Sequence, residues 1–284
     1  MITGATRVYG LVGHPVRHSL SPAMHNELFR RCGVDAVYVT FDVPPARAAV
    51  VVAAIRTLGL AGVNLTVPFK EAVIADLDAV SPEAELAGAV NVVVRGAEGA
   101  LTGHNTDGAG YLGALEEELG LGVAGEDLAV LGAGGTGRAV AAAAAAAGAR
   151  AVTFYNRTLA RAERAADLLA ARFPGTVFHA TDLDAASFGR RGGAHTRVVN
   201  CTSGPASPLV EQLPVEALPE GAAWTDANYW MADPPRLVAC ARRGLRLQRG
   251  IGMLMHQGAR AFTLFTGHVV GPDAIRGVLD VGGW

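Results

Sequence analysis

The 284 residues are sufficient for two domains or one large one, and the 50% of them that are hydrophobic can supply a sizeable core. A formal net charge of −2 at pH 7, with no run of basic residues, excludes a general attraction to nucleic acid or to an anionic membrane. The three cysteines are widely separated, which predicts that the chain has no metal site and no disulfide framework. The N-terminus lacks a signal-peptide pattern and no apolar run is long enough to span a membrane, so we expect a cytoplasmic protein.

Strand-like and helix-like segments alternate along almost the whole chain, which predicts an α/β architecture with parallel sheets. In the first part we expect strands at 8–12, 37–41, 63–65, 90–94 and 101–102, and helices at 22–33, 44–58 and from 105–108 to about 119. In the second part we expect strands at 128–131, 151–155, 177–178, 198–199 and 224–226, an Ala-rich helix ending at 148, and a last helix from 250. The pattern restarts after Gly125, so we place the domain boundary near Asp107, with the final helices returning to the first domain.

One lysine stands alone among the cations. Lys70 is the only lysine, whereas the other 23 of the 24 lysines and arginines are arginines. It closes the segment 62–70, which predicts a short strand leading into a turn and a helix that begins at Pro68. Arginine stays protonated at any usable pH, whereas a lysine ammonium is compact and can release its proton. The lone lysine therefore indicates a position where an arginine will not serve; the alternative is a compositional bias that left one surface lysine, and the count alone does not decide between them.

A glycine-rich turn lies between a predicted buried strand and a predicted helix. Gly132, Gly134 and Gly137 fit the G-x-G-x-x-G pattern in the context that dinucleotide binding requires. Glycines there let the backbone approach a pyrophosphate, and the helix N-terminus offers free N–H groups. The alternative is a glycine-rich turn that holds no ligand.

The next predicted strand indicates which dinucleotide is bound. It ends in Asn156-Arg157-Thr158, followed by Arg161, where an NAD-binding unit usually carries a carboxylate for the ribose hydroxyls. Two guanidinium groups in place of a carboxylate suit the 2′-phosphate of NADP. We therefore expect NADP rather than NAD; the alternative is a pair of solvated arginines at a helix start.

Hydrogen-bonding side chains follow several predicted strands of the first domain, at the edge where open α/β sheets bind ligands. They are Ser19 with Ser21, Asn64 with Thr66 and Lys70, Asn91, and Asn105 with Asp107. Mostly neutral hydroxyls and amides, with one lysine and one aspartate, suit a small polyhydroxylated substrate. Taken singly, each has a structural explanation: Ser21 could cap the helix near Pro22, and 105–108 could be a plain turn.

Together these motifs resemble those of the shikimate/quinate dehydrogenase family over nearly the whole chain. The matching segments are S-x-S-P at 19–22, N-x-T-x-P-x-K at 64–70, A-x-x-x-N at 87–91, N-T-D-G at 105–108, the NADP-type clamp at 156–158 with Arg161, and G-x-x-M-L-x-x-Q-G-A at 250–259. The resemblance implies an N-terminal α/β substrate-binding and catalytic domain with a mostly parallel sheet, formed by 1–106 plus 250–284. It also implies a Rossmann-like NADP-binding domain at 107–249 and a cleft between the two domains.

The same resemblance implies reversible reduction of 3-dehydroshikimate to shikimate by NADPH, with Lys70 and Asp107 as the catalytic proton-transfer pair and no metal. The substrate-binding positions that it implies are Ser19, Ser21, Asn64, Thr66, Asn91, Tyr229 and Gln257. The cofactor-binding positions that it implies are Gly132, Ala133, Gly134, Gly135, Thr136, Asn156, Arg157, Thr158, Arg161, Thr202, Gly250 and Met253.

The chain departs from the family pattern around Tyr229. An apolar residue is common before this tyrosine and a proline two positions after it, whereas this chain has Asn228 and Met231; Cys201 stands where Ala or Thr is usual. A quinate/shikimate or aminoshikimate dehydrogenase of the same family is therefore an alternative. A non-catalytic NADP-binding sensor is another, against which the pair of Lys70 and Asp107 argues. The expected partner is a small-molecule substrate, with no nucleic acid or membrane, and the expected state is a monomer or homodimer.

Overall fold

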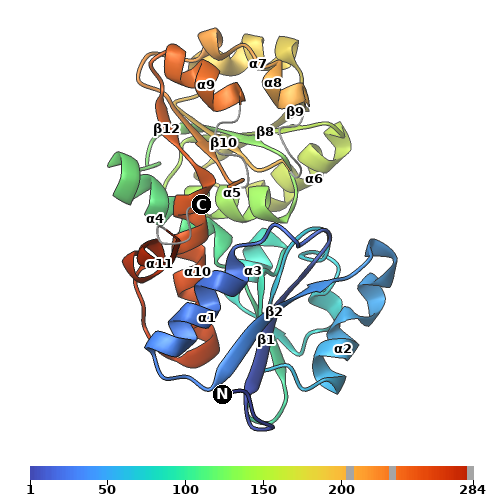
Figure 1. Cartoon of the computed structure of the whole chain (residues 1–284). Coiled ribbons are helices and arrows are strands. Elements are labelled where there is room, and N and C mark those ends of the chain that lie inside the picture. The colour runs from blue at the N-terminus through green and yellow to red at the C-terminus, as the bar shows by residue number, and fades with distance from the viewer. Residues whose placement is uncertain (203–207, 230–234, 280–284) are drawn as a thin grey trace. The chain divides into compact units, whose positions relative to one another are not determined.

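The computed structural model describes residues 1–202, 208–229 and 235–279. The chain divides into two compact units, Met1–Gly110 with Met255–Trp284 and Tyr111–Leu254. Each unit is built on one six-stranded sheet flanked by helices (Figure 1). The predicted α/β class is confirmed.

The first unit contains a mixed sheet with the strand order β2-β1-β3-β5-β6-β4. Its strands are β1 (Arg7–Gly13), β2 (Ala36–Asp42), β3 (Gly62–Leu65), β4 (Ala79–Val80), β5 (Val92–Arg95) and β6 (Leu101–His104). Strand β1 is parallel to β2 and β3, and β4 is parallel to β6, but β5 is antiparallel to both of its neighbours. Strand β5 reverses because residues 96–100 join it to β6 as a hairpin, which is too short for a parallel crossover.

Helices pack on both faces of this sheet, and Figure 1 shows α1 and α2 on opposite sides of it. The helices of the unit are α1 (Ser21–Arg31), α2 (Val51–Thr57, preceded by a 3₁₀ segment at Pro45–Val50), α3 (Pro82–Ala87), α11 (Pro272–Leu279) and parts of α4 (Asp107–Leu119) and α10 (Gly250–Thr266). Side chains alternate along β1: Val12 packs in the core with Val52 and Ile55 of α2, whereas Tyr9 contacts Phe29 and Phe265 of α1 and α10.

The second unit contains a wholly parallel sheet with the order β12-β11-β10-β7-β8-β9. Its strands are β7 (Asp127–Leu131), β8 (Ala151–Asn156), β9 (Val177–Asp182), β10 (Arg197–Asn200), β11 (Ala223–Asp226) and β12 (Arg246–Gln248). Its helices include α5 (Gly135–Ala146), α6 (Leu159–Ala170), α7 (Ala185–Arg191), α8 (Pro208–Glu211) and α9 (Pro235–Arg242). Chain order reverses between β7 and β10, which is the switch point where doubly wound sheets bind ligands.

Several elements differ from the predictions. No α-helix begins at Pro68: residues 67–72 form successive turns, followed by a 3₁₀ segment at Ile74–Asp76. Here Phe69 and Val73 are buried in the core while Pro68 is exposed, so the chain follows the core surface by turns. The strands β4 and β12 were not predicted, because two- and three-residue strands are too short to show a periodic pattern.

Candidate active site

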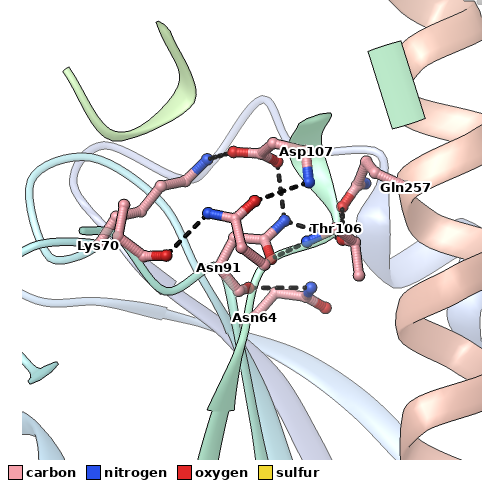
Figure 2. A network of polar contacts seen from close by, with 8 residues as sticks. Asn64, Lys70, Asn91, Thr106, Asp107 and Gln257 are labelled. Atoms are coloured by element: carbon pink, nitrogen blue, oxygen red, sulfur yellow. Dashed lines mark hydrogen bonds and ion pairs between the residues drawn. The ribbon is translucent and has the colours of Figure 1, made fainter. Parts of the chain in front are cut away.

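A buried ion pair joins two segments of the first unit. The Nζ atom of Lys70 donates to Oδ2 of Asp107 at 2.5 Å, and the side chains are 13% and 6% exposed (Figure 2). Such a charge-assisted bond in a largely water-excluded place is strong and geometrically defined. The backbone supports it: Phe69 is fully buried beside Lys70, and the Lys70 carbonyl accepts from the Val90 amide at 2.7 Å.

Asn91 holds the other side of the aspartate. Its Nδ2 atom donates to Oδ1 of Asp107 at 2.7 Å and to Oγ1 of Thr106 at 2.9 Å, while its Oδ1 accepts from the Thr106 amide at 2.8 Å. The Asp107 amide in turn donates to Oδ1 of Asn105 at 3.0 Å. Both carboxylate oxygens of Asp107 therefore accept a bond from a defined donor, one from Lys70 and one from Asn91.

Asn64 and Gln257 extend the polar network in two directions (Figure 2). Asn64 accepts at Oδ1 from the Tyr38 hydroxyl at 2.8 Å and donates from Nδ2 to the Asn91 carbonyl at 3.3 Å. On the other side, the Thr106 hydroxyl donates to Oε1 of Gln257 at 3.5 Å. Tyr38 was not predicted as a site residue, because the strand pattern does not show which polar group its hydroxyl meets.

The close approach of Gln257 requires a glycine in α4. A Cβ atom at Gly110 would lie 2.7 Å from Cβ of Gln257 and 2.9 Å from its backbone nitrogen. Any larger residue at Gly110 would therefore push the two helices apart and move the Gln257 side chain relative to Thr106.

The two serines and Thr66 belong to the same unit as the ion pair. Oγ of Ser19 accepts from the Ser21 amide at 3.2 Å, and Ser21 is buried as the first residue of α1. The helix N-cap is Leu20, without a side-chain cap, so the idea that Ser21 caps the helix is wrong. Thr66 is half-buried, and its methyl group packs against Gly13 where β1 ends.

The glycine-rich turn of the second unit needs two of its glycines for internal reasons. Gly132 has φ of +100°, and a Cβ atom at Gly137 would overlap the Gly132 carbonyl oxygen. Gly134 differs, because a Cβ atom there would meet nothing within 4 Å. The protein itself leaves this space open at the start of α5, where Gly135 is the first helical residue and Thr136 follows. Free space beside the first backbone amides of a helix is what pyrophosphate binding requires, so these residues could hold that group.

Asn156 connects that turn to the end of β8. Its Oδ1 accepts from the Ala133 amide at 3.1 Å, and its Nδ2 donates to the Thr158 carbonyl at 2.9 Å. The Ala133 amide is therefore already partnered within the protein. Arg157, Thr158 and Arg161 lie at the start of α6, where the two guanidinium groups are accessible to a phosphate.

The ends of β10 and β11 and the start of α10 carry the remaining predicted cofactor residues, Thr202, Gly250 and Met253, and the predicted substrate residue Tyr229. Thr202 donates from Oγ1 to Oδ1 of Asn200 at 2.7 Å, and Tyr229 is half-buried three residues after β11 ends. Gly250 and Met253 are buried in the first turn of α10. Of the departures from the family pattern, Cys201 is half-buried with its carbonyl against Gly132, whereas Met231 lies outside the described residues.

Within the ranges that the structure describes, no three His, Cys, Asp or Glu side chains are grouped so that they could hold a metal ion. In the same ranges, every helix is too short or too polar to cross a membrane.

Two family models match the chain. "Shikimate dehydrogenase substrate binding domain" matches residues 11–93, and "Shikimate 5'-dehydrogenase C-terminal domain" matches residues 250–279. The curated shikimate dehydrogenase (NADP(+)) of Geobacter metallireducens is 42% identical over 97% of this chain and 96% of its own length.

Solved structures are similar over the same extent. Shikimate 5-dehydrogenase from Thermus thermophilus, in complex with NADP(H) and shikimate, has a TM-score of 0.81 and 38% identity, covering 97% of this chain and 99% of that one. Quinate dehydrogenase from Corynebacterium glutamicum, in complex with NAD, has a TM-score of 0.83 and 30% identity, covering 97% and 99%. This chain belongs to the shikimate dehydrogenase family.

Proposed function

We propose that this protein is an NADP-dependent shikimate dehydrogenase that reversibly reduces 3-dehydroshikimate to shikimate. The observation that carries the proposal is the buried pair of Lys70 and Asp107, in a chain that has no other lysine. The relative from Geobacter metallireducens carries this activity in its name, and the Thermus thermophilus structure holds NADP(H) and shikimate.

Lys70 supplies the proton of the reduction. When bound, NADPH provides the hydride for the ring carbonyl carbon. As the carbonyl oxygen becomes an alkoxide, the Lys70 ammonium transfers a proton to it and becomes a neutral amine, and the reverse reaction returns that proton. Asp107 keeps the ammonium in position at 2.5 Å and offsets its charge. An arginine would stabilise the negative oxygen but would not release a proton.

Neutral polar side chains bind the rest of the substrate in this proposal. The hydroxyls and the carboxylate of shikimate meet Ser19, Ser21, Asn64, Thr66, Asn91, Tyr229 and Gln257. Support comes from the network that already orients these amides: Asn91 and Gln257 bond to Thr106, and Asn64 donates to the Asn91 carbonyl. Groups that are fixed before binding lose little freedom when the substrate arrives, which holds the carbonyl in line for reaction.

The second unit binds the cofactor in this proposal. Gly134 and the first backbone amides of α5 would hold the pyrophosphate, and Arg157 and Arg161 would pair with the 2′-phosphate. The open space at Gly134 and the exposure of both arginines after β8 support this placement. Residues 1–106 plus 250–284 then form the substrate-binding domain, and residues 107–249 form the nucleotide-binding domain.

Replacing the lysine by arginine tests the proposal. We expect Lys70→Arg to bind shikimate within about threefold of the wild type but to lower kcat by about 10² to 10⁴, the usual contribution of a positioned acid. Arg56→Lys is the matched control, because it makes the reverse exchange in an exposed ion pair with Asp78. Near-normal turnover of Lys70→Arg would refute the proton-transfer role.

The similarity to a quinate dehydrogenase in complex with NAD makes NAD-dependent quinate oxidation the second candidate activity. Steady-state kcat/KM values for shikimate and quinate, each measured with NADP and with NAD, distinguish this activity from the proposed one. The proposed function predicts the highest value for shikimate with NADP. A higher value for quinate would assign the chain to the other activity on the same fold.

A further inference from the structure

Two neighbouring strands of the second unit end side by side. In the parallel register of β10 and β11, Asn200 is opposite Asp226, and the Ala227 amide donates to the Asn200 carbonyl at 2.9 Å. The segments that follow therefore leave the same edge of the sheet, one through Thr202 and the other through Tyr229. The family resemblance implies cofactor binding at Thr202 and Gly250 and substrate binding at Tyr229.

The buried carboxylate of Asp226 organises this edge. Its Oδ2 accepts from Nδ2 of Asn200 at 2.9 Å and its Oδ1 accepts from the Asn228 amide at 2.8 Å. Asn200 also accepts at Oδ1 from the Thr202 amide at 3.1 Å. Asp226 is 7% exposed, so it is positioned to order protein groups rather than to meet solvent.

Asn228 connects three of these segments at once. Its amide is held by Asp226, its Nδ2 donates to the Thr202 carbonyl at 3.2 Å, and its own carbonyl lies so close to Gly250 that a Cβ atom there would overlap it. An apolar side chain at this position, which the family pattern commonly has, cannot make the bond to Thr202. This chain therefore contains a hydrogen-bonded link between the two segments that depends on its departure from that pattern.

We propose that Asn228 is a positioning residue for cofactor binding, which fixes Thr202 against the first turn of α10. The inference rests on the proposed function, because it needs the dinucleotide that this function uses and for which the family resemblance implies binding at Thr202 and Gly250. Asn228 acts through these neighbours by holding their backbone in one arrangement before the cofactor binds. Preorganisation of this kind raises affinity by reducing the ordering cost of binding.

Two substitutions test the link. Asn228→Leu removes the donor and restores an apolar side chain, and Asn228→Asp keeps the shape but places a carboxylate oxygen against the Thr202 carbonyl. We expect the Kd of NADPH, measured by fluorescence without substrate, to rise about tenfold for Asn228→Leu and more for Asn228→Asp, as expected for loss of one hydrogen bond and for added repulsion. In the apo protein, amide hydrogen exchange at Thr202 is expected to accelerate.

The matched control removes a similar bond elsewhere in the unit. Thr176 donates from Oγ1 to the Ala149 carbonyl at 2.7 Å, immediately before β9. We expect Thr176→Val to lower the unfolding midpoint without changing the Kd of NADPH or the exchange at Thr202. Wild-type affinity in both Asn228 variants would overturn the inference, as would equal weakening in Thr176→Val. These binding readouts do not depend on turnover, so absence of shikimate oxidation by the wild type would refute the proposed function separately.

Discussion

The buried His25 makes the acid stability of the first unit predictable. Its ring is 1% exposed and stacks on Tyr38 with centroids 4.4 Å apart and planes 15° from parallel. Nδ1 is buried without a hydrogen-bond partner among the described residues. Burial lowers the pKa of His25 from 6.5 to about 3, because the charged imidazolium would lose its hydration there. We predict that His25→Phe reduces the loss of stability in acid.

The sign and size of this pH effect on the free energy of unfolding follow from proton linkage. The unfolded chain takes up a proton at His25 below pH 6.5, whereas the native chain takes it up only near pH 3, so the free energy of unfolding falls as the pH drops through this window. At 1.36 kcal/mol per pKa unit, the contribution lost is about 2 kcal/mol at pH 5 and about 5 kcal/mol near pH 3. Phenylalanine keeps an aromatic ring on Tyr38 and removes the titration.

The assay is native-state hydrogen exchange at the β1 and β3 amides, which reports opening of the first unit alone. Between pH 7.5 and pH 5, we expect the opening free energy of His25→Phe to fall by about 2 kcal/mol less than that of the wild type. The opening free energies at the two pH values are compared within each variant, so any packing cost of the larger ring cancels. His268→Gln, which removes an exposed histidine from the same unit, is the control. An unchanged pH dependence in His25→Phe would show that burial does not keep His25 neutral.

Three further predictions concern the second unit. Arg157→Ala combined with Arg161→Ala should weaken NADPH binding selectively, measured against NADH; equal weakening of both cofactors would contradict the phosphate clamp. Burial raises the pKa of Asp226 from 3.8 to about 6, so the native state holds the proton to a higher pH than the unfolded state does. The free energy of unfolding therefore decreases by about 2 kcal/mol as the pH rises from 4 to 6. Asp226→Asn should remove this dependence in pH-dependent urea unfolding, and a persistent dependence would assign it elsewhere. Gly137→Ala, whose Cβ atom would overlap a backbone carbonyl, should lower the unfolding midpoint and abolish NADPH binding, whereas Gly175→Ala, with nothing within 4 Å, should not.

Features with local causes could be predicted from the sequence. The turn at 132–137 was recognisable because a positive φ at Gly132 and the close approach at Gly137 leave only glycine at those positions. The fold confirms the predicted α/β class. The similar proteins confirm the family resemblance and the prediction of NADP as the cofactor. The roles of the individual site residues stay predictions.

Features set by long-range contacts could not be predicted. The sequence does not show that Tyr38 meets Asn64, or that Asn91 donates to the oxygen of Asp107 opposite Lys70, because these bonds join strands and loops distant in the chain. The turns after Pro68 replaced a predicted helix because burial of Phe69 overrides local helix propensity. The antiparallel direction of β5 likewise depends on a hairpin, which the short apolar runs do not distinguish from a crossover.

The single lysine also makes selective chemical labelling of this chain possible. Reagents that acylate amines normally modify many surface lysines at once, but here the only primary amines encoded are the N-terminal one and Nζ of Lys70. The lysine side chain is 13% exposed and held by Asp107, so its labelling depends on opening of the pair rather than on surface accessibility. A mass spectrum after limited acylation therefore reports on the proposed catalytic lysine without mutation, and a bound substrate is expected to protect this amine from the reagent.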